Sequence, residues 1–176
     1  IEENIEVVLF DKNFKTIDNE IKNKCTCIKC DLSNKKEVVK SINKVVNQFG
    51  GIDILISNSG SAFQGQMKDL NEKILQDSMA NNFYSHHYII QETVKIMINQ
   101  SFGGSISINL SKQSINPGKN FGPYGIAKAS ALFMMKQYAL ECGKHNIRVN
   151  GVNADRIQSG LLTKEMINQR AKARGL

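Results

Sequence analysis

Tyr124 and Lys128 are the two residues whose types and spacing most directly suggest chemistry. They stand four positions apart in the run Tyr-Gly-Ile-Ala-Lys, which places both side chains on one face of a helix. A free tyrosine has a pKa of about 10 and is a poor base near neutral pH. A nearby ammonium group favours the phenolate, so we expect Lys128 to lower the pKa of Tyr124. Such a pair can exchange a proton with a hydroxyl or carbonyl oxygen of a substrate.

Three polar positions precede this pair in a definite order. Ser111 stands thirteen residues before Tyr124, at the expected end of a strand, where its hydroxyl can hold the same substrate oxygen. Asn58 and Gly60 end the preceding strand in a Ser-Asn-Ser-Gly turn, and Asn82 lies in the long helix between. A Tyr-x-x-x-Lys pair alone occurs by chance in many helices, whereas the ordered set is specific.

Short β-branched runs alternate with longer helical patterns along the chain, which indicates parallel βαβ units. The predicted strands are 5–10, 25–30, 53–57, 105–110 and 147–152. The predicted helices cover the apolar positions from 38 to 46, then 71–99, 124–144 and 162–173. We expect a single α/β domain over 1–176. In parallel sheets chemistry gathers beyond the carboxyl ends of the strands, where Asp11, Asp31, Asn58 and Ser111 fall.

These motifs resemble those of the short-chain dehydrogenase/reductase family over almost the whole chain. Ser57-Asn58-Ser59-Gly60 is similar to the family's Asn-Asn-Ala-Gly, and Ser111, Tyr124 and Lys128 match its Ser…Tyr-x-x-x-Lys motif. The resemblance implies a Rossmann-type, doubly wound parallel sheet in three α/β/α layers. It also implies an NAD(P)-dependent oxidoreductase that interconverts a secondary alcohol and a carbonyl. Tyr124 would be the acid/base, with Lys128 lowering its pKa and binding the nicotinamide ribose. Ser111 would orient the substrate oxygen, and Asn82 would support a water in the proton relay.

The same resemblance bears on the cofactor. A carboxylate at Asp11 can accept hydrogen bonds from the adenosine ribose hydroxyls and would repel a 2′-phosphate, which favours NAD over NADP. Lys12 and Lys15 nearby could weaken that repulsion. Asp31 matches the family position that meets the adenine ring. The cofactor-binding set that the resemblance implies is Asp11, Asp31, Leu32, Asn58, Ser59, Gly60, Tyr124 and Lys128.

Two loops carry a closer resemblance. The stretches 111–124 and 152–163 look like the dehydrogenase half of bifunctional aldolase/short-chain dehydrogenases of the rhamnulose-1-phosphate aldolase/alcohol dehydrogenase type. This implies a small hydroxyaldehyde or sugar-derived substrate and a fused or associated aldolase domain. The alternative is a catalytically inactive relative that serves as a nucleotide-binding or assembly module. The intact Ser, Tyr, Lys and Asn set argues against that alternative.

Two segments of the family pattern are missing from the sequence. The family opens with a strand and a glycine-rich turn that binds the pyrophosphate, and nothing before Ile5 matches them. The chain also stops at Leu176, before the family's last strand. In the family's strand order the missing first strand lies mid-sheet, between two strands that are present. We therefore expect a fragment, or a degenerate relative, with backbone groups left unpaired inside the sheet.

Composition limits the partners. The net charge is +7, but the lysines are scattered and form no basic stripe, so we expect no nucleic-acid partner. No apolar run approaches the ~20 residues that cross a bilayer, and the N-terminus is not signal-like. We therefore expect a soluble cytoplasmic protein with a small-molecule alcohol or carbonyl substrate. Family members commonly pair the helices corresponding to 71–99 and 124–144, which implies a homodimer or homotetramer.

The cysteines and histidines do not predict a metal site. Cys25, Cys27 and Cys30 lack a nearby fourth ligand, and alternation along a buried strand would put the first two on one face as small hydrophobic side chains. His86 and His87 have no metal-ligand spacing with a third residue. We interpret these two histidines as packing or subunit-interface residues.

Overall fold

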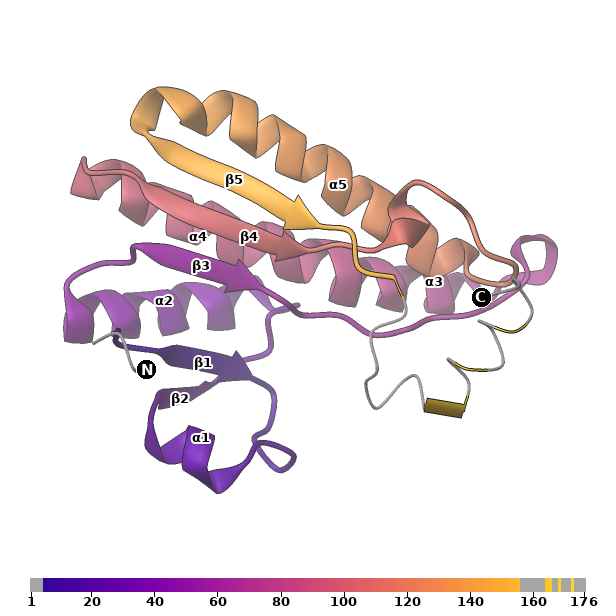
Figure 1. Cartoon of the computed structure of the whole chain (residues 1–176), viewed down its shortest axis with the longest axis horizontal. Helices are drawn as coiled ribbons and strands as arrows, with labels where there is room; N and C mark the ends of the chain where they lie inside the picture. The colour runs from indigo at the N-terminus through magenta and orange to yellow at the C-terminus, as the bar shows by residue number, and fades with distance from the viewer. Residues whose placement is uncertain (1–4, 156–163, 166–167, 169–171, 173–176) are drawn as a thin grey trace.

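Five parallel strands form two separate sheets in the computed structural model, which describes residues 5–155, 164, 165, 168 and 172 (Figure 1). One sheet pairs β1 (Val8–Asp11) with β2 (Thr26–Lys29). The other has the order β3 (Ile54–Ser57), β4 (Gly104–Asn109), β5 (Ile147–Val152). All three pairings are parallel, so the carboxyl ends of the strands in each sheet meet at one edge. The five predicted strands are confirmed.

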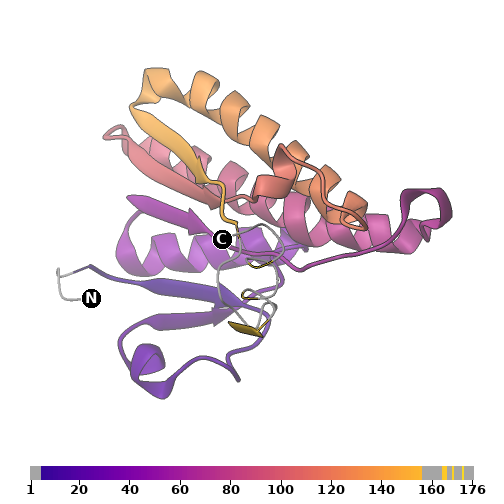
Figure 2. The same cartoon turned by 45° about the vertical axis from the view of Figure 1, so that its right-hand side comes forward.

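The division between the sheets falls where the sequence analysis expects it. The edges of β1 and β3 are not paired with each other, and residues of both strands line one cavity of about 1100 Å³. Figure 2 shows the two groups of strands from a second side, with β1 and β2 set apart from the other three. The facing backbone N–H and C=O groups of these two edges have no strand partner among the described residues.

Three long helices cover one face of the strands. They are α2 (Lys35–Phe49), α4 (Ser85–Gln100) and α5 (Gly122–Cys142); α4 packs against both of the others (Figure 1). Burial alternates accordingly along β5, where Ile147 and Val149 are buried and Arg148 and Asn150 are exposed. The described residues thus form two layers of the predicted three-layer arrangement. The helix predicted over 162–173 falls largely outside the described residues.

The helix predicted over 71–99 is divided into three parts. It runs as α3 (Glu72–Met79), a π-helical turn η2 (Ala80–Tyr84) and then α4. The sequence analysis missed α1 (Asn19–Asn23), which is too short to show a helical period. It also missed three short 3₁₀ turns, η1 (Met67–Asp69), η3 (Lys112–Ser114) and η4 (Gly143–His145). A π-helical turn inside an α-helix is frequently found at functional sites.

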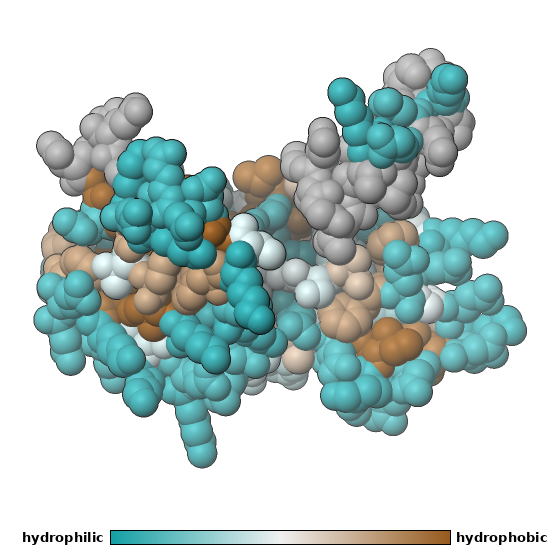
Figure 3. All heavy atoms as spheres, turned by 90° about the horizontal axis from the view of Figure 1, so that it is seen from below, coloured by the Kyte–Doolittle hydropathy of each residue, from teal (hydrophilic) through white to brown (hydrophobic). Residues whose placement is uncertain are grey.

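The hydrophobic core lies between the helix layer and the strands. Its largest fully buried side chains are apolar ones on α4, β4 and β5, namely Ile90, Met97, Ile106, Ile108 and Ile147. Seen from below, hydrophilic side chains cover most of the surface and a few apolar ones show between them (Figure 3). Two of the exposed apolar side chains are Ile54 and Ile56, on the β3 face that these helices do not cover.

The cysteines of β2 depart in part from their prediction. Cys25 and Cys27 do share one face, with their sulfur atoms 3.9 Å apart, but Cys27 is exposed and so does not pack as a buried hydrophobic side chain. Cys30 is fully buried in the core. Within the described ranges, no three His, Cys, Asp or Glu side chains lie close enough to hold a metal ion.

Candidate active site

The carboxyl ends of β3 and β4 and the first turns of α5 bring the predicted proton-transfer residues together. Ser111 follows β4 in an extended conformation, and its Oγ caps η3 by accepting a hydrogen bond from the Gln113 N–H at 3.2 Å. Pro123 stands in the first turn of α5, where its missing N–H costs no helical hydrogen bond. Tyr124 and Lys128 follow on that helix. This local chemistry fixes the start of the helix and thereby the direction of the Tyr124 side chain.

Tyr124 and Ser111 interact directly. Burial raises the pKa of the Tyr124 phenol, and a side-chain hydrogen bond with Ser111 acts in the opposite direction. The sequence analysis expected Lys128 to lower the pKa of Tyr124, and this expectation is wrong for the structure. The reason is burial, which disfavours the charged phenolate and outweighs the hydrogen bond with Ser111.

Lys128 is a buried cation, with a side chain that is only 3% exposed. Its Nζ donates a hydrogen bond to the backbone carbonyl of Asn109 at 2.8 Å and lies 3.3 Å from the His86 Nε2. No carboxylate forms an ion pair with it in the part of the chain that the structure describes. Burial therefore lowers the pKa of Lys128 to about 8.

Asn82 clamps the loop that follows β3 onto η2. Its side chain is fully buried; Oδ1 accepts from the Ser61 N–H at 3.0 Å, and Nδ2 donates to the carbonyls of Ser61 and Ser78 at 2.9 and 3.1 Å. Gly60 lies against this clamp, since a Cβ there would come within 2.8 Å of the Asn82 Oδ1 and 3.6 Å of the Lys128 Nζ. A side chain at position 60 would therefore displace the Asn82 amide, whereas its distance to the Lys128 Nζ is that of an ordinary van der Waals contact.

Most of the predicted cofactor residues line the larger cavity. Six of the eight contribute to its wall, namely Asp11, Asp31, Leu32, Asn58, Ser59 and Gly60, whereas Tyr124 and Lys128 do not line it. Asn58 is held by a hydrogen bond from the Asn109 Nδ2 to its Oδ1 at 2.6 Å.

The two acidic side chains of this wall have different partners. Asp11 is exposed and accepts a hydrogen bond from the Asn13 N–H at 3.0 Å. Partial burial acts to raise the pKa of Asp31, but hydrogen bonds from Ser33 and the Lys12 ammonium at 3.2 Å leave that pKa below its usual value. Lys12 is therefore engaged with Asp31 and not with Asp11.

The family resemblance implies a nicotinamide cofactor along this wall. Asp11 and Asp31 present carboxylates on it, and Gly60, on the same wall, lies against Asn82 and near the Lys128 Nζ. The glycines that line the cavity within the described ranges are Gly50, Gly51 and Gly60, and they do not form a glycine-rich turn at a helix N-terminus. The implied site thus has no glycine-rich turn for a pyrophosphate among the described residues.

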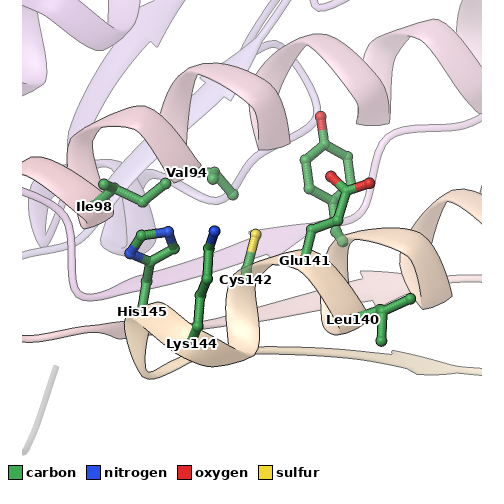
Figure 4. A pocket seen from close by; sticks show the side chains of 8 residues that line it. Val94, Ile98, Leu140, Glu141, Cys142, Lys144 and His145 are labelled. Atoms are coloured by element: carbon green, nitrogen blue, oxygen red, sulfur yellow. The ribbon is translucent and has the colours of Figure 1, made fainter.

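A second cavity, of about 580 Å³, lies between the ends of α4 and α5. Figure 4 shows Cys142, Lys144 and His145 pointing from the end of α5 and from η4 toward Val94 and Ile98 of α4. Tyr124 begins α5 and this cavity lies at its other end, so none of the predicted site residues lines it.

The comparisons with known proteins agree with this geometry. Residues 2–174 match the family model described as enoyl-(acyl carrier protein) reductase. The chain is 33% identical over 132 residues to short-chain dehydrogenase reductase 3a of Arabidopsis thaliana, covering 74% of this chain and 51% of that protein. The chain belongs to the short-chain dehydrogenase/reductase family. Members of this family use NAD(P).

Two further relatives show how much of this chain and how much of each relative are covered by the match. The uncharacterized oxidoreductase YuxG of Bacillus subtilis is 29% identical over 139 residues, which cover 79% of this chain and 20% of that protein. A short-chain type dehydrogenase/reductase of Mycobacterium marinum has a solved structure with a TM-score of 0.78 and 26% identity, covering 84% of this chain and 63% of that one. The chain spans about half the length of three other curated relatives that it matches.

His86 is the site residue whose contacts the sequence analysis missed. It is fully buried, as a packing residue would be, but it lies against the Lys128 Nζ and within 2.6 Å of the Ser57 Oγ. The signal was its position four residues after Asn82, one turn along the same helical face. His87, by contrast, is only half-buried and lies near Tyr138.

None of the described helices is long and apolar enough to cross a membrane.

Proposed function

We propose that this chain is the catalytic domain of an NAD-dependent oxidoreductase that interconverts a secondary alcohol and a carbonyl. The observation that supports it best is the meeting of Ser111, Tyr124 and Lys128 at the strand ends. The turn at Gly60 links this cluster to the wall that carries Asp11 and Asp31. NAD supplies the hydride acceptor when bound, and the chain supplies positioning and proton transfer.

The family resemblance gives each side chain a proposed role. Tyr124 exchanges a proton with the substrate oxygen, and Ser111 orients that oxygen by a hydrogen bond. An ammonium group has three N–H donors; Asn109 and His86 account for two in Lys128, which leaves one for the nicotinamide ribose. Asn82 supports a water in the relay.

NAD is proposed over NADP because of Asp11. Its exposed carboxylate can accept hydrogen bonds from ribose hydroxyls and would repel a 2′-phosphate. The basic side chain nearest in sequence, Lys12, is engaged with Asp31 at 3.2 Å, so it does not neutralise Asp11.

The substrate is proposed to be a small hydroxyaldehyde or sugar-derived alcohol, in a protein with a fused or associated aldolase domain. The two loops that resemble bifunctional aldolase/short-chain dehydrogenases are the basis for this proposal. YuxG supports a longer architecture, because the match covers only 20% of it and leaves several hundred residues outside the dehydrogenase region. A homodimer or homotetramer is also proposed, since Phe133 and Leu140 of α5 are 70% and 78% exposed.

The second candidate is an inactive relative that binds nucleotides or serves in assembly. It is favoured by one observation, that the described residues provide no glycine-rich turn for the pyrophosphate. The substitution Tyr124→Phe separates the two functions, because it removes the exchangeable phenolic proton and keeps the ring.

The test uses the full-length protein that contains this chain, with NAD and NADP compared on a panel of small hydroxyaldehydes and sugar alcohols. We expect turnover with NAD, followed by NADH absorbance, and a loss of about 100-fold or more in Tyr124→Phe. NADH affinity, measured by fluorescence, should change little. A wild-type protein that binds NADH and turns over no substrate of the panel would favour the nucleotide-binding module instead.

A further inference from the structure

A buried chain of three polar side chains joins β3, α4 and α5 behind the candidate active site. The Ser57 Oγ lies 2.6 Å from the His86 Nδ1, and the His86 Nε2 lies 3.3 Å from the Lys128 Nζ. All three residues are buried, with exposed fractions of 3%, 0% and 3% in that order. Burying a polar group costs free energy unless the group is hydrogen-bonded, and each of these three side chains has a hydrogen-bond partner.

The chemistry of the lysine sets the tautomer of the histidine. An ammonium group only donates hydrogen bonds, so the His86 Nε2 must accept and carry no proton. The ring proton of a neutral imidazole is then on Nδ1, which donates to the Ser57 Oγ. Burial, together with the charge of Lys128, lowers the pKa of His86 to about 3, so the ring is neutral as the accepting role requires.

We propose that His86 is a positioning residue that holds the Lys128 ammonium at the turn formed by Gly60 and Asn82, and that Ser57 fixes the orientation of its ring. The consequence for turnover rests on the proposed oxidoreductase function, whereas the contacts stand without it.

The surroundings of Lys128 explain why a second acceptor matters. The Asn109 carbonyl is the other hydrogen-bond acceptor of the ammonium, and no described carboxylate pairs with it. Among the described residues, Tyr124 is another titratable side chain beside the Lys128 ammonium, and it lies on the same helix as Lys128. A hydrogen bond to a charged group contributes more than one between neutral groups, so loss of the His86 acceptor should both release the side chain and disfavour its charged form.

The first experiment titrates Lys128 by NMR in the full-length protein labelled with ¹³C at lysine Cε, without cofactor; the signal is assigned with Lys128→Arg. In His86→Leu the midpoint should fall by about 1 pH unit or more, because an acceptor for the charged form is lost. His86→Gln keeps an acceptor and should restore most of the shift. The matched control is His87→Leu, on the same helix, which should leave the midpoint unchanged. Equal midpoints in wild type and a folded His86→Leu would overturn the proposal.

The second experiment needs no substitution and so does not depend on a variant that folds. ¹⁵N NMR of the histidine rings in the wild-type protein at neutral pH should show the His86 proton on Nδ1 and an unprotonated Nε2. A ring with its proton on Nε2 cannot accept from the ammonium and would overturn the proposal.

The two proposals fail differently. In an active protein, kcat/KM should fall about 10-fold or more in His86→Leu and recover largely in His86→Gln. Absence of turnover in the wild type, with the Lys128 midpoint still shifted by His86→Leu, would sink the oxidoreductase function and leave the positioning role standing. Equal turnover in wild type and His86→Leu, with unchanged Lys128 midpoints, would overturn the positioning role of His86 and leave the oxidoreductase function standing.

Discussion

At the scale of single residues, Lys128 combines a buried ammonium with hydrogen-bond acceptors that are both uncharged. Burial disfavours the charged form, and neither the Asn109 carbonyl nor the neutral His86 ring provides the full compensation of a carboxylate. The result is a lysine that is charged at neutral pH and close to its titration point at mildly alkaline pH. The charge of Lys128 is thus present at the candidate site at neutral pH, and burying that charge lowers the free energy of unfolding.

This lysine should make stability depend on pH in a definite direction. Its ordinary pKa is 10.5 and its pKa in the folded chain is about 8, so between these values unfolding takes up a proton. Stability due to Lys128 should therefore rise with pH across this window, by about 1.4 kcal/mol per pH unit. The measurement is the difference in free energy of unfolding between wild type and Lys128→Met, from urea titrations at pH 7 to 10.5. A difference that stays constant above pH 8 would contradict the assignment.

At the scale of elements, the π-helical turn η2 and the loop after β3 form one unit. Asn82 donates to and accepts from Ser61, so the two segments are joined by a pair of hydrogen bonds through one side chain. Gly60 is enclosed between this side chain and Lys128. The end of β3 is thereby held beside Lys128 of α5, although the two elements are far apart in the sequence.

Gly60→Ala should disturb this unit. The added Cβ would lie 2.8 Å from the Asn82 Oδ1, which cannot move without losing its hydrogen bond from Ser61. We expect a loss of about 1–3 kcal/mol in the free energy of unfolding, together with weaker NADH binding.

The matched control is Gly143→Ala. A Cβ there meets nothing within 4 Å and the residue has helical backbone angles, so alanine should be neutral or stabilise by up to about 1 kcal/mol. If urea titration shows that the two substitutions change the free energy of unfolding equally, the contact between Gly60 and Asn82 does not contribute to stability.

At the scale of the whole molecule, the sheet is divided between β1 and β3. The two edges face one cavity, and Ile54 and Ile56 of β3 are 58% and 73% exposed. Backbone groups on an unpaired edge must be hydrogen-bonded by water or by another strand. We propose that the full-length protein supplies a strand between these edges, as the family pattern implies.

Hydrogen exchange tests this proposal. In the 176-residue chain alone, amides on the free edge of β3 should exchange quickly, whereas those of β4, paired on both sides, should be protected. In the full-length protein the β3 amides should become as protected as those of β4. Exchange at β3 that is equally fast in both proteins would show that no strand pairs there.

The order of elements and the grouping of the candidate site residues could be predicted from the sequence, because both depend on local patterns. Period-two and helical spacing predicted the five strands and the long helices, and the Tyr-x-x-x-Lys spacing predicted that Tyr124 and Lys128 share a helical face. The family followed from the order of Asn58, Asn82, Ser111 and this pair. The positions of Asp11 and Asp31 on one cavity wall followed from the rule that parallel strands end at a common edge.

Only the tertiary structure decided how these side chains act on one another. The direction of the Tyr124 pKa shift depends on burial and on the hydrogen bond with Ser111, and both are set by how α5 packs beside the end of β4. The contact of His86 with Lys128 joins residues 42 positions apart in the sequence. The hydrogen bonds of Asn82 with Ser61 likewise join η2 to the loop after β3, 21 positions away in the sequence. Burial and hydrogen-bond partners are properties of contacts distant in sequence, which no local pattern contains.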